Sequence, residues 1–333
     1  MSLYRLLVSV CLPATLLILS AAAQPAWVNS DSLFPGLPSS MHVHRSEGKL
    51  NGRPHVAWYV EARLSDKILE FGTDTSYGRR LTPSAFYERN GWPLVVVNGT
   101  FFSFTDNRNL NVVVRNGRLV SYNIMSIPGR GRDTLLYHQV TRPALGIDRK
   151  RRADVAWLHT DSARKFPLAY ENAPISSKDS TAYFPVPSGR DIREIPDIRN
   201  AGVRKRWKMR TAIGGGPVLV YDGRVRITND QERMFYGKAR EDLHPRTAMG
   251  YTADGRLLIL AVEGRRPGVA EGASLTELAQ IFVALGAREA LNLDGGGSSC
   301  LLVMGKETIR PSDKEGQRAV PAVFQITTNE RPQ

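Results

Sequence analysis

Three segments share the feature that most constrains the fold of this chain: an apolar run, a two-residue turn that ends in Gly, and a second apolar run. The segments are 112–120, 218–225 and 249–260, and they turn at Asn116-Gly117, Asp222-Gly223 and Asp254-Gly255. Asn-Gly and Asp-Gly pairs accept positive φ at both central positions, the geometry that joins two antiparallel strands tightly. The pattern therefore predicts three β-hairpins.

Three further strands and two helices are expected. Residues 55–61 alternate between apolar and polar, and short apolar runs at 94–97 and 290–293 predict buried strands. The end signals of helices flank two segments. Residues 82–91 open on Thr-Pro and close on Asn-Gly, and residues 274–286 open on a Ser/Glu capping box and end at Gly. These elements predict an α+β fold with mixed, largely antiparallel sheets, hairpins and a few packed helices.

The domain organisation is read from composition. Residues 24–54 are polar and rich in turn residues, which indicates a lead-in, and residues 55–330 are expected to form a single domain. Within that domain, about 150–206 is polar and basic, with scattered prolines, and is interpreted as loops or an insertion.

The first 23 residues resemble a secretory signal peptide. Arg5 precedes an apolar run, and Ala21-Ala22-Ala23 is a small-residue cleavage site. A membrane anchor is the alternative, against which Pro13 in the apolar run argues. We therefore expect a secreted or periplasmic protein with no stable membrane span after cleavage. Cys300 is then its only cysteine, so no internal disulfide is expected.

The chain is basic: 45 Lys and Arg against 32 Asp and Glu give 45 − 32 = +13. This excess indicates an anionic partner, which could be nucleic acid, a phosphate-bearing glycan or a membrane surface. Export argues against nucleic acid. The basic runs 149–152 and 204–208 are accordingly interpreted as solvated loop charge.

The chemistry is expected in the run Asp294-Gly295-Gly296-Gly297-Ser298-Ser299, which directly follows a predicted buried strand. Consecutive glycines leave bare backbone whose N–H groups can form a nest for an anion. Asp294 would project a carboxylate beside that nest. The alternative is an ordinary tight turn in which Asp294 bonds its own backbone.

Three other polar residues stand where apolar runs begin or end. Asn98 is either a polar group in a cleft or a turn former, and Arg246 either binds phosphate through its planar fork or is surface charge. Glu263 is either a second active-site carboxylate or the salt-bridge partner of Arg265. No metal or cofactor is predicted, because the histidines lack ligand spacing and one cysteine cannot make a zinc knot. A divalent ion held by oxygen ligands stays open.

An ordered set of motifs over roughly residues 90–328 resembles the phosphodiester glycosidase family. The motifs are Asn98-Gly99-Thr100-Phe101-Phe102, Ile213-Gly214-Gly215-Gly216-Pro217, Arg246-Thr247-Ala248-Met249-Gly250, Glu263-Gly264-Arg265, the 274–286 helix, Asn292-Leu293-Asp294-Gly295-Gly296-Gly297-Ser298-Ser299 and Arg318-Ala319-Val320-Pro321. Two positions depart from the family pattern. Thr100 stands where a second Gly is usual, and Glu263 stands where the animal member has Asp.

The resemblance implies that residues 55–330 form a catalytic domain of an exported hydrolase, which cleaves the C–O bond of a sugar-1-phosphodiester in a phosphorylated glycan. Asp294 and Glu263 are then the expected catalytic carboxylates. The substrate-binding residues expected are Asn98, Arg246, Thr247, Arg265, Asn292, Gly295, Gly296 and Ser298. Two rival functions stay open: a glycosidase acting on sugars without phosphate, and a non-catalytic module that binds anionic glycan.

Overall fold

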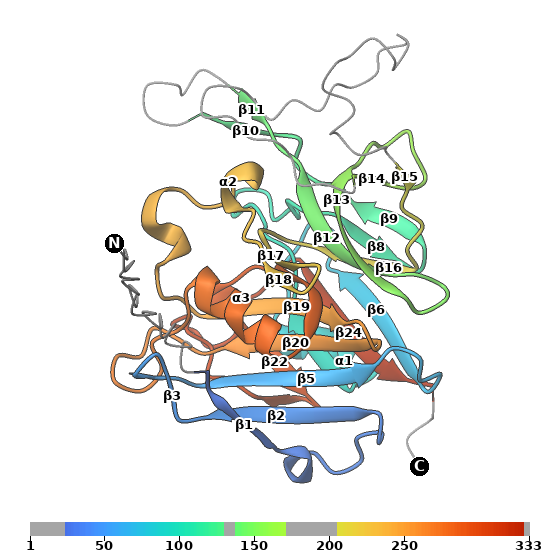
Figure 1. The fold of residues 1–333 in the computed structure, drawn as a ribbon. Coiled ribbons are helices and arrows are strands. Elements are labelled where there is room, and N and C mark those ends of the chain that lie inside the picture. The colour runs from blue at the N-terminus through green and yellow to red at the C-terminus, as the bar shows by residue number, and fades with distance from the viewer. Residues whose placement is uncertain (1–23, 130–136, 171–204, 330–333) are drawn as a thin grey trace, which may run out of the picture.

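A computed structural model describes residues 24–129, 137–170 and 205–329 (Figure 1). The predicted signal peptide, residues 1–23, lies outside this part. The described chain is built mainly from antiparallel strands arranged in three large sheets, with few helices. No described helix combines the length and the apolar character that a membrane crossing requires.

The largest sheet has eight strands. In spatial order they are β1 (Ala26–Asn29), β2 (Met41–Glu47), β5 (Ala57–Arg63), β20 (Arg256–Val262), β19 (Arg246–Thr252), β21 (Ala287–Asn292), β17 (Val218–Tyr221) and β18 (Arg224–Val225). The second sheet has seven strands: β15 (Lys205–Arg206), β14 (Leu168–Tyr170), β13 (Ala153–His159), β12 (Arg142–Ile147), β16 (Thr211–Gly214), β8 (Val113–Arg115) and β9 (Arg118–Ser121).

The third sheet has five strands: β23 (Lys306–Glu307), β22 (Leu301–Val303), β7 (Val95–Asn98), β24 (Ala322–Thr328) and β6 (Leu69–Thr75). Two small pairs join β3 (Lys49–Leu50) to β4 (Arg53–Pro54) and β10 (Ser126–Pro128) to β11 (Tyr137–Gln139). The helices are α1 (Pro83–Arg89), α2 (Asn229–Glu232) and α3 (Leu275–Ala284), with short 3₁₀ turns η1 (Asp31–Leu33), η5 (Gly237–Arg240) and η6 (Gly296–Ser298).

The hairpin and helix predictions are confirmed. β8 pairs with β9, β17 with β18 and β19 with β20, each through its Asn-Gly or Asp-Gly turn. Thr82 caps α1, because its side chain accepts the N–H of Ala85. Ser274 and Glu277 form the expected reciprocal capping box at the start of α3.

The three sheets pack around one shared apolar core, and the period-2 alternation of the strands divides their side chains between two faces. Val95 and Val97 of β7 enter the shared core, whereas Val96 faces a second cluster that includes Phe86 of α1. In the same way, alternate residues of β20 enter either the shared core or a cluster under α3. Both helices therefore cover outer faces of sheets.

Two segments differ from the sequence expectation. The lead-in expected at 24–54 supplies β1 and β2 of the eight-stranded sheet, where Met41 lies opposite Ala62 of β5. Its alternation is hard to recognise because the partly exposed positions carry histidines. The loops expected at 150–206 include β13 and β14, whose Val155 and Trp157 enter the shared core. Residues 171–204 of that segment lie outside the described residues.

The fold brings several strand ends to one place. β19 begins where β20 ends, since Arg246 lies opposite Val262, and Asn292 near the end of β21 lies opposite Ala248. The segment that follows β21 then crosses to the five-stranded sheet and enters β22, which pairs with β7. The Asp-Gly-Gly-Gly run thus lies in the crossing between two sheets.

Candidate active site

The turn that carries Asp294 is fixed by backbone hydrogen bonds to both sheets. The N–H of Asp294 donates to the carbonyl of Gly99 beyond β7 (3.0 Å), and the N–H of Gly296 donates to the carbonyl of Pro245 just before β19 (2.8 Å). A Cβ atom on Gly295 would lie 2.9 Å from the carbonyl oxygen of Pro245. Glycine is therefore needed here for close approach of backbone to backbone.

The prediction of a nest of free N–H groups is wrong for Gly295, Gly296 and Ser298, because each of their N–H groups already donates a hydrogen bond. The Gly295 N–H donates to Oδ1 of Asp294 (3.0 Å), and the N–H of Ser298 donates to the carbonyl of Gly295 (3.1 Å). The Gly296 N–H is engaged by Pro245, as described above. The bond from Ser298, and a similar one from the N–H of Ser299 to the carbonyl of Gly296 (3.2 Å), belong to the 3₁₀ turn into which the run folds. Most of the predicted backbone donors are therefore not free to bind an anion.

The buried side chain of Asn98 supports the turn that carries Asp294 and does not face solvent. Its Nδ2 donates to the carbonyl of Asp294 (2.7 Å), and its Oδ1 accepts from Oγ1 of Thr247 (2.8 Å) and from the N–H of Cys300 (3.0 Å). Asn98 and Thr247 are fully buried. The contacts with sugar predicted for both residues are replaced by contacts that position Asp294.

The side chain of Asn292 likewise bonds backbone groups of the fold. Its Nδ2 donates to the carbonyl of Gly216 (2.8 Å) and to that of Leu293 (2.9 Å), and its side chain is buried. A Cβ atom on Gly215 would overlap the backbone carbonyl of Asn292. Gly215 therefore lets β21 pass closely, and the bonds of the Asn292 amide nitrogen go to backbone carbonyls within the fold.

Asp294 is partly buried, and among the residues of the site its carboxyl has the largest shift in pKa. Burial raises the pKa of Asp294 to about 7, although the Gly295 N–H and the charge of Arg318 act in the opposite direction. The Ser298 hydroxyl faces the carboxyl but makes no well-formed hydrogen bond within the described chain. A carboxyl poised near neutral pH is suited to gaining or losing a proton during a reaction.

Two guanidinium groups lie against the glycines. A Cβ on Gly296 would be 2.9 Å from Nη2 of Arg265, and a Cβ on Gly297 would overlap the guanidinium of Arg318. Arg265 is exposed and has no ion pair among the described residues, whereas Nε of Arg318 donates to Asp313 (2.5 Å). Arg265 also adopts a left-handed φ of 63°, which is unusual for a residue other than Gly and is often found at functional sites.

Arg246 lies behind the same turn and is buried. Its Nε donates to the carbonyl of Ala273 (2.9 Å) and its Nη2 to that of Asp242 (2.9 Å). Burial lowers the pKa of Arg246 to about 10, so the guanidinium stays charged at neutral pH. A buried cation bonded to neutral carbonyl groups contributes positive potential at the site, whether or not it touches a ligand.

Glu263 is buried, and both of its carboxylate oxygens are engaged. Oε1 forms an ion pair with Arg266, and Oε2 accepts the N–H of Arg310 (2.9 Å). The salt-bridge alternative is therefore correct in kind, but the partner is Arg266 and not Arg265. Within the described residues, no hydrogen bond joins Glu263 to Asp294.

The sequence reasoning missed two residues of this site. Arg318 appears in the sequence only as part of the 318–321 motif, and His244 is not among the predicted site residues. Burial and the charges of Arg246 and Arg265 lower the pKa of His244, which favours the neutral form of its imidazole. A histidine two residues before a buried arginine was the available signal. Among the described residues, no group of three His, Cys, Asp or Glu side chains could hold a metal ion.

Comparison with known proteins adds an independent line of argument. Residues 168–327 match the phosphodiester glycosidase family. The chain is 27% identical over 121 residues to N-acetylglucosamine-1-phosphodiester alpha-N-acetylglucosaminidase of Bos taurus, a match that covers 36% of this chain and 23% of that protein. The chain thus matches about a quarter of the length of this relative.

Two solved structures share the fold. A hypothetical protein from Synechocystis superposes with a TM-score of 0.59 at 16% identity, covering 92% of this chain and 64% of that one. The zebrafish N-acetylglucosamine-1-phosphodiester alpha-N-acetylglucosaminidase catalytic domain, auto-inhibited by its pro-peptide, superposes with a TM-score of 0.52 at 18% identity, covering 92% and 82%. Residues 168–327 thus match the phosphodiester glycosidase family, and the two solved structures show that the chain shares their fold.

Proposed function

We propose that this chain is an exported hydrolase that cleaves the glycosidic C–O bond of a sugar-1-phosphodiester and releases the sugar from the phosphate. One observation carries the proposal: the carboxyl of Asp294, with a pKa of about 7, lies in a turn whose next residues contact the guanidinium groups of Arg265 and Arg318. The fold thus brings a titratable group and a pair of arginines together from three separate segments of the chain.

Arg265 and Arg318 are assigned to the phosphate. A guanidinium group presents paired donors that match two phosphate oxygens at once. Arg265 has no acidic partner among the described residues, so an incoming phosphodiester displaces no ion pair there. Buried Arg246 adds positive potential behind the turn. As charge develops on the departing phosphate, these cations stabilise it.

Asp294 is assigned to the anomeric carbon, as nucleophile or as the base that activates water. Most glycosidases need a second carboxylic acid to protonate an alkoxide leaving group. A phosphate monoester leaves as a stable anion, so the demand for that proton is much smaller. One reactive carboxylate, with arginines in place of the acid, is sufficient for this leaving group.

Glu263 keeps its proposed role as second carboxylate only if its charge is needed during turnover. Its bonds to Arg266 and to the Arg310 backbone instead suggest that it holds the segment bearing Arg265. Glu263→Gln separates these roles. A loss of kcat with normal melting supports catalysis, whereas a lower melting temperature with a near-normal rate identifies a structural residue.

The function is tested by incubating purified protein with synthetic sugar-1-phosphodiesters, with and without a chelator, beside the matching alkyl glycosides. We expect release of sugar from the phosphodiesters alone, and loss of that activity in Asp294→Asn. Equal turnover of the alkyl glycosides would identify an ordinary glycosidase. Binding of the phosphodiesters without any product would identify a binding module.

Export is tested separately from activity. If residues 1–23 are a cleaved signal, expression with an export pathway yields a mature chain that begins at Gln24, and intact-mass measurement detects the loss of the first 23 residues. A full-length mass in the exported fraction contradicts this part of the proposal and leaves the hydrolase assignment untouched.

A further inference from the structure

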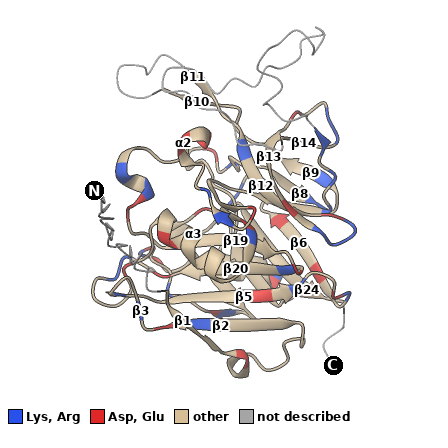
Figure 2. Cartoon of the chain, viewed as in Figure 1, with Lys and Arg blue, Asp and Glu red and all other residues tan. Residues whose placement is uncertain are grey.

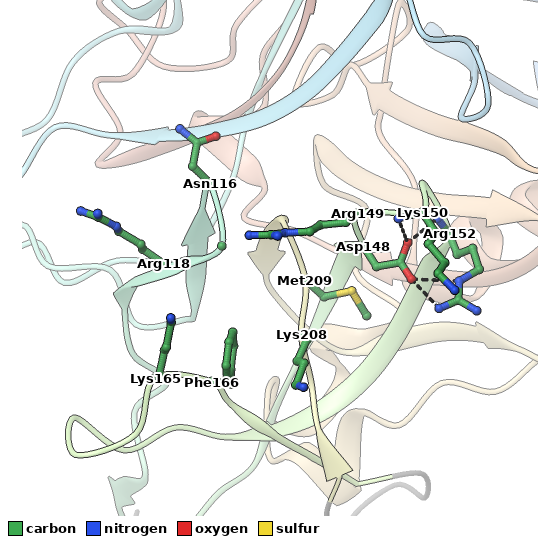
Figure 3. Close-up of a pocket in the computed structure, with 11 residues that line it drawn as sticks. Asn116, Arg118, Asp148, Arg149, Lys150, Arg152, Lys165, Phe166, Lys208 and Met209 are labelled. Atoms are coloured by element: carbon green, nitrogen blue, oxygen red, sulfur yellow. Dashed lines mark hydrogen bonds and ion pairs between the residues drawn. The ribbon is translucent and has the colours of Figure 1, made fainter.

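A second cationic cavity lies on the seven-stranded sheet, formed by elements separate from the Asp294 turn. It has a volume of about 610 Å³ and is lined by the β8–β9 and β12–β13 turns and by the loops before β14 and β16 (Figure 3). Lys and Arg gather at the start of β9, on β15 beside β14 and on the neighbouring loops (Figure 2). Six cationic side chains line it: Arg118, Arg149, Lys150, Arg152, Lys165 and Lys208.

The charges of this cavity are poorly compensated. Its single lining acid, Asp148, accepts from Nε (2.9 Å) and Nη2 (2.6 Å) of Arg152 and from the N–H groups of Lys150 and Arg152. The other five cations have no ion pair within the described residues. Like charges gathered in one concave surface repel each other and focus a positive potential, which favours a multiply charged anion.

The cations are also held in place. The Phe166 ring lies between Lys165 and Lys208 in Figure 3, with the two ammonium nitrogens 5.6 and 5.9 Å from its centroid. These cation–π contacts order two otherwise flexible side chains. On the other side, Arg151 points away from the cavity and donates to the carbonyls of Asp66 (2.8 Å) and Leu69 (2.7 Å). That anchor fixes the turn that presents Arg149 and Lys150.

We propose that this cavity binds phosphate groups of a glycan chain remote from the bond being cleaved, so that the substrate is a polymer of sugars joined through phosphodiesters. The proposal rests on the proposed function, from which it takes the substrate class. Its size suits a short charged segment and not a flat bilayer. Its one aromatic ring is occupied by two lysines, so it offers no free platform for stacking bases, as single-stranded nucleic acids require.

The test uses full-length mature protein carrying Asp294→Asn, so that substrate stays intact, and measures binding by calorimetry. The probes are a synthetic oligomer of four sugar-1-phosphate units and the single-unit phosphodiester. We expect the oligomer to bind about tenfold more tightly than the single unit, because a second site adds to the first. Lys165→Gln/Lys208→Gln should remove that gain and reduce the salt dependence of binding.

The matched control is Lys49→Gln/Arg224→Gln, which removes the same charge from exposed positions outside the seven-stranded sheet. It should leave oligomer binding intact. Equal oligomer affinity in the cavity variant and its parent overturns the proposal, as does an equal loss in the control. A cavity-dependent affinity for single-stranded DNA, or for vesicles containing phosphatidylglycerol, that exceeds the oligomer's overturns the glycan assignment.

Turnover distinguishes this proposal from the proposed function. With Asp294 restored, Lys165→Gln/Lys208→Gln should hydrolyse the single-unit phosphodiester at the parental rate and the oligomer with a KM about tenfold higher. If no phosphodiester is hydrolysed while the oligomer still binds through Lys165 and Lys208, the hydrolase assignment fails and the cavity stands. If hydrolysis is seen and oligomer binding ignores the two lysines, the cavity proposal fails alone.

Discussion

At the scale of single residues, the raised pKa of Asp294 sets the expected pH dependence of the reaction. If the carboxylate is the nucleophile or base, the active form is deprotonated, so kcat/KM should rise with pH and level off above the pKa of about 7. Asp294→Asn should lower the rate by orders of magnitude. A pH profile of kcat/KM checks this, and a rate that falls as pH rises through 7 would assign Asp294 as the acid instead.

The same pKa makes a separate prediction about stability. The folded pKa of Asp294 lies above the unfolded value near 3.8, so the folded protein binds the extra proton between these pH values, and stability falls as pH rises through that window. Each pKa unit is worth about 1.4 kcal/mol. Asp294→Asn should therefore melt at a higher temperature than the parent at pH 8, and at a similar temperature near pH 4. Equal melting temperatures at pH 8 contradict the raised pKa.

Individual residues also show where sequence reasoning reaches its limit. The run around Asp294 could be predicted as special, because three consecutive glycines are unfavourable without a structural need. The structural need that these glycines meet could not be inferred from the sequence. Whether an Asn faces a ligand or its own backbone depends on contacts between distant segments, and Asn98 meets Asp294 across 196 positions of sequence. The position of Arg318 beside Gly297 could not be inferred for the same reason.

At the scale of elements, the glycines of the turn after β21 have no side chains, and this leaves room for the guanidinium groups of the site. Gly297→Ala would push the Arg318 guanidinium aside, and this side chain is flexible enough to move without unfolding the turn. Losing one charge-assisted contact to phosphate costs about 1.5–3 kcal/mol, so we expect kcat/KM for the phosphodiester to fall by about ten- to a hundredfold. Kinetics with the purified variant measure this.

A matched control is available on β6. Gly72→Ala adds the same methyl group where the nearest atoms, on Gln325, lie 3.7 Å away, so both rate and melting temperature should be nearly unchanged. If Gly297→Ala keeps full activity, Arg318 does not bind the phosphate. If it unfolds while Gly72→Ala does not, the glycine is required for the backbone of the turn and not for the guanidinium.

Among the elements, those with local signals were predictable and those without were not. The hairpins carry Asn-Gly or Asp-Gly turns, and α3 carries its capping box, so a few neighbouring residues determine each of them. β2 has alternating histidines, and the residues that precede β13 are polar and basic. These two strands form because neighbouring strands accept their apolar faces, which is information from tertiary structure.

At the scale of the whole molecule, three sheets around one core bring distant strand ends to a single turn. The crossing from β21 to β22 places Asp294 where the eight-stranded and five-stranded sheets meet. The seven-stranded sheet carries the separate cationic cavity. The fold thus presents one carboxyl among arginines and a second surface for anions, an arrangement that suits a charged polymer better than a small neutral sugar.

The bond that breaks tests this account most directly. A phosphodiesterase directs water to phosphorus, whereas the account places Asp294 at the anomeric carbon. Hydrolysis should be run in water enriched in heavy oxygen, and the released phosphate ester analysed by mass spectrometry, because the anomeric oxygen of a free sugar exchanges with water. The account predicts an unlabelled phosphate ester and label on freshly released sugar. Heavy oxygen in the phosphate ester would contradict the glycosidase mechanism.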